Sequence, residues 1–185
     1  NGAIFMDLPE VKMRVSNGRV DIRPLPRLRS RMLVTEAMVM VGEAAARYAL
    51  ARGLSFPFTT QDPVDAADRQ PAGLAAMYAL RRNLRPRQYS SLPGPHCSLG
   101  LDVYAQVTSP LRRYLDLVAH QQLRACLRGG DPLESQAIIE RVGAAEAAAI
   151  GVRRAERLSR EHWTMVYFQQ HPGWRGQGVL VEKRM

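Results

Sequence analysis

A short alternation of apolar and polar residues, interrupted by one strong turn signal, marks the start of the chain. Residues 11–15 alternate as the two faces of a half-exposed strand require. Asn17-Gly18 follows, and this dipeptide favours a tight hairpin turn because both residues tolerate positive φ. Residues 19–23 supply a returning strand. The pattern therefore predicts an antiparallel β-hairpin.

Longer segments carry apolar residues at the three- and four-residue spacing of amphipathic helices. Gly53 ends the first of these segments, and glycine is the preferred residue just after a helix. The helices that we expect span residues 29–52, 72–83, 110–127 and 133–169.

The remaining segments are short and extended. Residues 54–70 are extended or loop-like, and residues 87–91, 101–107 and 174–181 resemble strands. Taken together, the pattern predicts an α+β fold in which long helices pack on a small mixed or antiparallel sheet.

Charge narrows the range of partners. The 185 residues are 46% hydrophobic, enough for one core, and carry a formal net charge of +9. Such a charge favours a polyanionic partner, and the excess of arginine over lysine favours phosphate groups. We expect no membrane span, since the most apolar stretch, residues 32–50, contains three charged side chains.

The two cysteines, Cys97 and Cys126, lack the spacing of a zinc site or a disulfide framework. They fit a reducing cytosol, so we expect a cytoplasmic protein. The chain starts at Asn1 and stops within an apolar alternation, and we interpret it as an internal piece of a longer protein.

A hydroxyl pair followed by proline, Thr108-Ser109-Pro110, stands where the third helix should begin. Either hydroxyl side chain can accept a hydrogen bond from a free backbone N–H, and proline at the first helical position loses no bond. The sequence therefore predicts a helix start at Pro110, with four residues on its apolar stripe: Leu111, Tyr114, Leu115 and Val118.

Arg112 and Arg113 follow at once, where cations face the positive end of the helix dipole. This placement favours an anion in front of the turn, and phosphate suits both a helix start and a guanidinium. Alternatively, Arg112 simply pairs with Asp116 four residues on. His120 lies on the same helical face, and we interpret it as a hydrogen-bonded structural residue.

Acidic residues give three further candidates. Glu36 lies on an otherwise apolar helix, so it must be paired or solvated in a cleft, and an ion network with Glu43 and Arg47 is the alternative. Glu156 is either a site residue or the partner of Arg160 in a surface pair. Three aspartates at a spacing of three could form a metal site, but we interpret them as structural residues: Asp62, Asp65 and Asp68.

Two of these segments resemble a known family. The run from His96 through Leu99-Gly100-Leu101 and Tyr104 to Thr108-Ser109-Pro110-Leu111-Arg112-Arg113-Tyr114, Asp116 and His120 is similar to the signature of the ribonuclease II and ribonuclease R (RNB) exoribonucleases. Residues 33–47 resemble that family's Glu-Glu-x-Met helix, with Thr35 in place of the usual first Glu and Gly42 in place of the usual Asn.

The resemblance implies a role for each matching residue. Arg112 would stabilise charge at the scissile phosphate, and Glu36 would orient Arg112 or the attacking water. Glu156 would be the acidic residue that reaches the catalytic centre from the last helix. The resemblance further implies RNA-binding positions, at which Phe5 would stack on bases and Arg113 would bind a neighbouring phosphate: Thr108, Ser109, Arg113, Tyr114 and Phe5.

The resemblance also implies a division of the chain and a reaction. Residues 1–172 would be the C-terminal part of an RNB catalytic domain, and residues 173–185 the start of an OB-fold. The whole protein would be a monomer that degrades single-stranded RNA in the 3′→5′ direction to 5′-nucleoside monophosphates. It would use Mg²⁺ held by residues upstream, so that this piece alone would be inactive.

Two other classes of protein remain open. One is a catalytically inactive RNB-like domain that only holds RNA or a protein partner. The other is a basic DNA-binding fragment, although no recognition-helix motif is visible.

Overall fold

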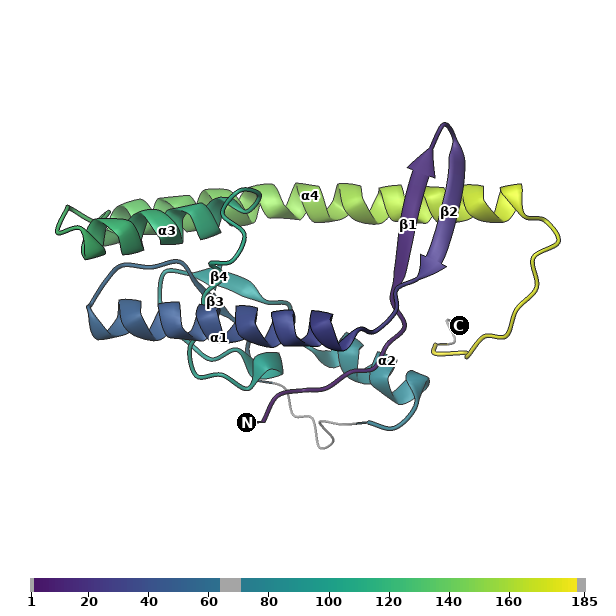
Figure 1. Cartoon of the computed structure of the whole chain (residues 1–185), viewed down its shortest axis with the longest axis horizontal. Helices are drawn as coiled ribbons and strands as arrows, with labels where there is room; N and C mark the ends of the chain where they lie inside the picture. The colour runs from purple at the N-terminus through teal and green to yellow at the C-terminus, as the bar shows by residue number, and fades with distance from the viewer. Residues whose placement is uncertain (1, 64–70, 183–185) are drawn as a thin grey trace.

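The computed structural model describes residues 2–63 and 71–182, and its two longest helices run along the length of the molecule (Figure 1). Both lie where the sequence predicts them: α1 at Arg29–Ala51 and α4 at Ser135–Gln170. Two shorter helices and a 3₁₀ turn complete the helical elements of the described residues: α2 (Leu74–Asn83), α3 (Tyr114–Leu127) and η1 (Cys97–Leu99). No helix in the described residues is long and apolar enough to cross a bilayer.

The predicted hairpin is confirmed. β1 (Val11–Ser16) pairs with β2 (Arg19–Pro24) in antiparallel register, and Asn17 and Gly18 make the turn with φ values of 50° and 74°. Gln170, the last residue of α4, accepts a hydrogen bond from the Val20 N–H and donates one to the Gly18 carbonyl, at 3.1 and 2.7 Å. The end of α4 is therefore tied to the hairpin.

A second, smaller antiparallel pair lies between the helices. It joins β3 (Phe58–Thr60) to β4 (Gln88–Ser90). Phe56 and Phe58 meet edge to face, with ring centroids 5.8 Å apart, and both are buried. Small and β-branched residues from α1, α3 and the 103–107 segment fill the remaining space of this core: Ala46, Ala49, Val103, Ala105, Val107 and Ala119.

A second cluster joins α3 to the first part of α4. Leu115 and Val118 pack on Ile138 and Val142, and Ile138 is fully buried. The buried residues of α4 in the structure are these two, both in its first third. Val152 lies further along the helix, beyond the second core, and is exposed. The apolar face of α4 is thus covered at one end.

Gln122 connects three segments near this junction. Its Nε2 donates to the carbonyls of Ser55 and Leu133 at 2.7 and 3.0 Å, and its Oε1 accepts from the Leu133 N–H at 2.7 Å. The side chain is 1% exposed. Because every hydrogen-bonding atom of the amide can reach a partner, this polar group is satisfied inside the protein.

Gly42 allows α1 to approach the 103–107 segment closely. A Cβ at this position would lie 2.3 Å from the Tyr104 ring and 2.6 Å from the Ala105 carbonyl oxygen. No larger residue fits without displacement, so the glycine here is required by space. It replaces the Asn that the resembling family usually carries.

Three expected elements differ from the structure. The third helix begins at Tyr114 rather than Pro110, and Leu111, expected on its apolar stripe, is fully exposed. Residues 101–107 and 174–182 form no strand. Strands need a hydrogen-bonded neighbour, and the described residues offer none to the exposed 174–181 segment.

Candidate functional site

The segment that precedes α3 is a closed turn. The Ser109 carbonyl accepts the N–H groups of both Arg112 and Arg113, at 3.1 and 3.0 Å. Arg113 then adopts an extended backbone, with φ −121° and ψ 116°, and α3 begins at the next residue. Arg112 therefore lies on the turn before α3 and outside its first helical turn.

Asp116 holds this turn from inside the helix. Its Oδ2 accepts the Ser109 N–H at 2.8 Å and two guanidinium N–H groups of Arg113, at 3.0 Å from Nε and 2.6 Å from Nη2. The same Nη2 also donates to the Thr108 hydroxyl at 3.2 Å. The predicted pairing of Asp116 with Arg112 is wrong. The Asp116 carboxylate lies in the first turn of α3 and binds Arg113, the residue directly before that helix.

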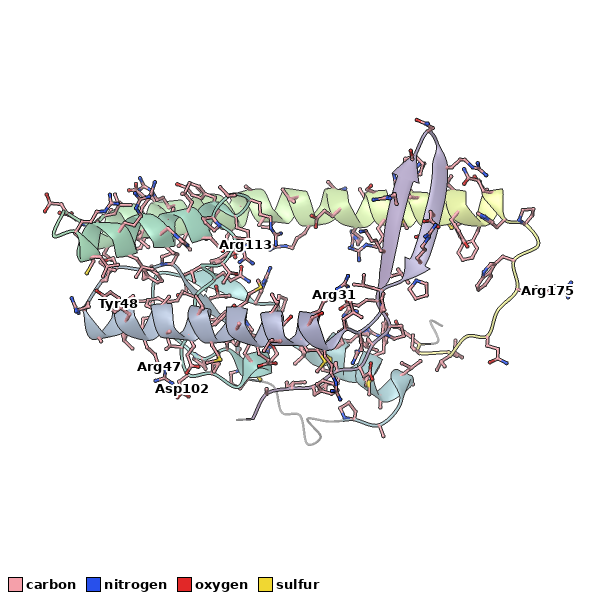
Figure 2. All side chains as sticks on the ribbon, viewed as in Figure 1. Arg31, Arg47, Tyr48, Asp102, Arg113 and Arg175 are labelled. Atoms are coloured by element: carbon pink, nitrogen blue, oxygen red, sulfur yellow. The ribbon has the colours of Figure 1, made fainter. Side chains whose placement is uncertain are left out.

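The two neighbouring arginines consequently differ. The Arg113 side chain is 23% exposed and bonded to Asp116, whereas the Arg112 side chain is exposed and has no polar partner among the described residues. Figure 2 shows Arg113 near the start of α3, on the side that faces α1 in this view. The Asp116 carboxylate thus serves as the expected anion for Arg113, while the Arg112 guanidinium remains available to bind a ligand.

Leu111 and Tyr114 flank this available arginine, and both are exposed. Thr108 and Ser109, predicted to contact RNA, are half-buried, and the Thr108 hydroxyl already accepts from Arg113. His120 donates its Nε2–H to the Val107 carbonyl at 2.7 Å, which agrees with its interpretation as a structural residue.

A separate groove lies at the start of α1. It encloses about 470 Å³ between the 5–10 segment, the end of β2 and the first two turns of α1. Phe5 lines it with 54% of its surface exposed, and the Arg27 guanidinium lies 6.0 Å from the ring centroid. Arg27 also pairs with Asp7. An exposed ring beside a guanidinium suits a flat, negatively charged ligand.

Glu36 and Thr35 both line this groove. Helical geometry places Thr35, seven residues before Gly42, on nearly the same face as that glycine, and Glu36 about 100° further round. Glu36 is exposed, and the ion pair found nearby joins Glu43 to Arg47 at 2.8 Å instead. No hydrogen bond or ion pair in the described residues joins Glu36 to Arg112.

Glu156 lies on the exposed second half of α4. The expected surface pair with Arg160 is absent from the ion pairs of the described residues. Arg153 pairs instead with Glu146 at 3.5 Å, and Glu146 accepts the Tyr89 N–H at 3.0 Å. The structure therefore does not bring Glu156 into contact with Arg112 or Glu36.

Polar residues to which the sequence assigned no individual role surround the core behind the turn. The Tyr89 hydroxyl donates to Gln106 at 2.9 Å, and the His96 ring meets the Tyr104 ring edge to face at 5.4 Å. Burial raises the pKa of Tyr89 and of Tyr104, and it lowers the pKa of His96. The one available signal was Gln106, a polar residue in the apolar run 103–107.

The described residues contain no group of three or more acidic, histidine or cysteine side chains that could hold a metal ion. Asp62 is exposed, and Asp65 and Asp68 lie outside the described residues. The implied Mg²⁺ therefore has no set of ligands in the described part of the chain. Cys97 and Cys126 carry free thiols.

Comparison with known proteins identifies the family. Residues 65–129 match the family model of the RNB domain. The chain is 32% identical to an uncharacterized ribonuclease of Synechocystis sp., over 97% of this chain and 28% of that protein. It is 28% identical to the chloroplastic/mitochondrial ribonuclease II of Arabidopsis thaliana, over 80% of this chain and 19% of that protein. The chain belongs to the RNB family, and it spans less than a third of the length of these relatives.

Solved structures show the same fold. RNase R of Mycoplasma genitalium, in complex with ribose-methylated single-stranded RNA, matches 91% of this chain and 33% of its own with a TM-score of 0.78 and 18% identity. The Dss1 exoribonuclease of Candida glabrata, an active-site mutant, matches 92% of this chain and 24% of its own with a TM-score of 0.83 and 20% identity. The predicted α+β class is confirmed by these matches.

Proposed function

We propose that the protein containing this chain is an exoribonuclease that hydrolyses single-stranded RNA from its 3′ end and releases 5′-nucleoside monophosphates. One observation carries the proposal: the Arg112 side chain is exposed and has no ionic partner among the described residues, on a turn that Asp116 and Arg113 hold by hydrogen bonds. Membership of the RNB family and the ribonuclease names of the relatives support it.

The chemistry follows from this placement of Arg112. Phosphodiester hydrolysis builds negative charge on the phosphate oxygens in the transition state, and a fixed guanidinium stabilises that charge. Because Arg112 forms no ion pair in the described residues, no such pair has to break when a phosphate arrives. Mg²⁺, with ligands contributed from outside the described residues, would supply the activation of water.

Binding of the RNA strand is assigned to the groove. Phe5 would stack on a base, which is worth about 1–3 kcal/mol and depends little on sequence. Arg27 and Arg31 would neutralise neighbouring phosphates, and Glu36 would orient the reacting groups from the same wall. The net charge of +9 supports an RNA partner of this kind. We further propose that the whole protein is a cytoplasmic monomer.

Substitution of Arg112 by Ala in the full-length protein tests the proposal. We expect kcat for a 5′-labelled single-stranded oligoribonucleotide to fall by about 10²–10³-fold, the cost of removing one donor that stabilises transition-state charge. Binding of the strand should change far less, since other contacts remain. Arg47→Ala, which removes another exposed arginine far along α1, is the matched control and should leave kcat unchanged.

Blocking the 3′ end of the RNA substrate tests the direction of cleavage. A 3′-blocked oligoribonucleotide should resist degradation, and a free 3′ end should yield mononucleotides in the presence of Mg²⁺. Turnover of Arg112→Ala at the wild-type rate would contradict the phosphate role. Tight RNA binding by the wild-type protein without any Mg²⁺-dependent degradation would instead support an RNA-binding scaffold.

A further inference from the structure

The turn that carries Arg112 is closed by a buried ionic group, and this group has no role in the proposed reaction so far. We infer that Asp116 and Arg113 are positioning residues that fix the direction in which Arg112 leaves the turn. The inference rests on the proposed function of Arg112.

The hydrogen bonds show how the turn is held. A single oxygen, Oδ2 of Asp116, binds the backbone N–H of Ser109 at one end of the turn and the Arg113 side chain at the other, at 2.8 and 2.6 Å. The Ser109 carbonyl closes the same turn from its other side by accepting two backbone N–H groups. Arg112 lies between these two fixed ends, so its backbone has little freedom.

Burial distinguishes this pair from the other ion pairs of the described residues. The Asp116 side chain is 0% exposed, whereas the carboxylates of the remaining pairs are each at least 26% exposed. A buried ion pair is weak evidence for stability, because desolvation of the two charges offsets most of their attraction. A function in geometry accounts better for a buried carboxylate at this turn.

Arg113 gives a second argument. Its Nε and Nη2 atoms are committed to Asp116, and Nη2 also reaches Thr108. The planar fork that would bind a phosphate through two parallel bonds is therefore already occupied by a carboxylate. The two neighbouring arginines therefore have different roles: Arg113 fixes the turn, and Arg112 binds the phosphate of the substrate. This assignment replaces the predicted binding of a phosphate by Arg113.

A double-mutant cycle in the full-length protein separates positioning from general stability. Asp116→Asn keeps the shape of the side chain but removes the charge that binds both ends of the turn. We expect kcat to fall by about 10–100-fold, because small displacements of a reacting group cost this much, with KM changed less than threefold. In an Arg112→Ala background, Asp116→Asn should lower kcat by less than about twofold further, because the group that it positions is gone.

Two further variants complete the design. Glu43→Gln breaks an ion pair of similar length, at 2.8 Å, on the exposed side of α1, and it should leave kcat unchanged. Arg113→Lys keeps the charge but cannot make both guanidinium bonds, so it should reproduce the loss of kcat seen in Asp116→Asn. Thermal unfolding of each variant shows whether the protein remains folded at the assay temperature.

The outcomes are distinct. If Asp116→Asn lowers kcat by the same factor with and without Arg112, the positioning role is overturned. If Arg112→Ala itself has wild-type turnover, the proposed function fails, and the inference fails with it. If both Asp116→Asn and Arg113→Lys are unfolded at the assay temperature, the pair is structural and the inference is overturned.

Discussion

The two ends of the molecule are built differently. At one end, α3, the first part of α4 and the second half of α1 enclose two apolar cores and a satisfied buried amide, Gln122. At the other end lie the hairpin, the first half of α1 and the second half of α4 (Figure 1). These elements carry large apolar side chains that remain exposed. Those with at least half of their surface exposed include Met32, Leu33, Met40, Ile150, Leu158 and Met165.

This difference separates two tasks. The turn with Arg112 belongs to the packed end, where the backbone is fixed by Asp116 and by the cores beneath it. The groove with Phe5 and Glu36 belongs to the open end, where ion pairs are exposed and individually weak. A group that stabilises a transition state needs exact placement, whereas a groove that holds a flexible strand tolerates adjustment.

The strongest test of this comparison uses two isoleucines on one helix. Ile138→Ala, in the buried part of α4, should destabilise the protein by about 2–5 kcal/mol through loss of burial and a residual cavity. Ile150→Ala, 64% exposed on the same helix, should change stability by less than about 0.5 kcal/mol. Thermal unfolding of the intact protein measures both. Equal effects would show that the ends do not differ in packing.

Two glutamines give a second, smaller contrast. Gln122→Ala leaves half-buried backbone groups of Ser55 and Leu133 unpaired and should cost about 2 kcal/mol. Gln170→Ala removes two bonds between α4 and the hairpin at an exposed position and should cost less than about 1.5 kcal/mol. Hydrogen exchange should show faster opening of the hairpin alone in the second variant. Faster exchange throughout the cores would contradict this.

The smallest expected effect concerns pH. Burial lowers the pKa of His96, whose Nδ1 is buried without a partner, so the folded protein favours the neutral ring. In the unfolded chain the His96 ring takes up a proton near its ordinary pKa of about 6.5. Below that pH the unfolded state binds a proton that the folded state does not, so stability is lost as the pH falls toward and through the lower folded pKa. Lowering the pH below about 6.5 should therefore reduce the melting temperature of wild type more than that of His96→Gln. Equal reductions would exclude His96 as the cause.

Much of the secondary structure was predictable from local patterns. The hairpin follows from alternation and the Asn17-Gly18 turn, and α1 ends before Gly53, which adopts the predicted left-handed conformation with φ 59°. Leu115 and Val118 are buried, as their helical spacing predicts. Such features depend on neighbours in the sequence, which is why the pattern alone identifies them.

The start of α3 was not predictable in this way. Ser109-Pro110 is a genuine start signal, but it begins a single turn, and the helix proper begins at Tyr114. The reason is Asp116, whose carboxylate reaches back to the Ser109 N–H and to Arg113 and thereby stabilises the closed turn between them and the extended backbone at Arg113. The strand expected at 174–181 had the right composition but lacked a partner, which the pattern does not reveal.

Gly42 has a consequence for the geometry between the two ends. Where α1 meets the 103–107 segment, α1 contributes backbone and side chains no longer than a methyl group, at Gly42, Ala46 and Ala49, and the Tyr104 ring lies against Gly42. On the α1 side there are no rotamers to change, so we expect α1 to move relative to the 103–107 segment only as one rigid rod. Glu36, six residues before the glycine, is thereby held about 9 Å along that rod from the point of contact.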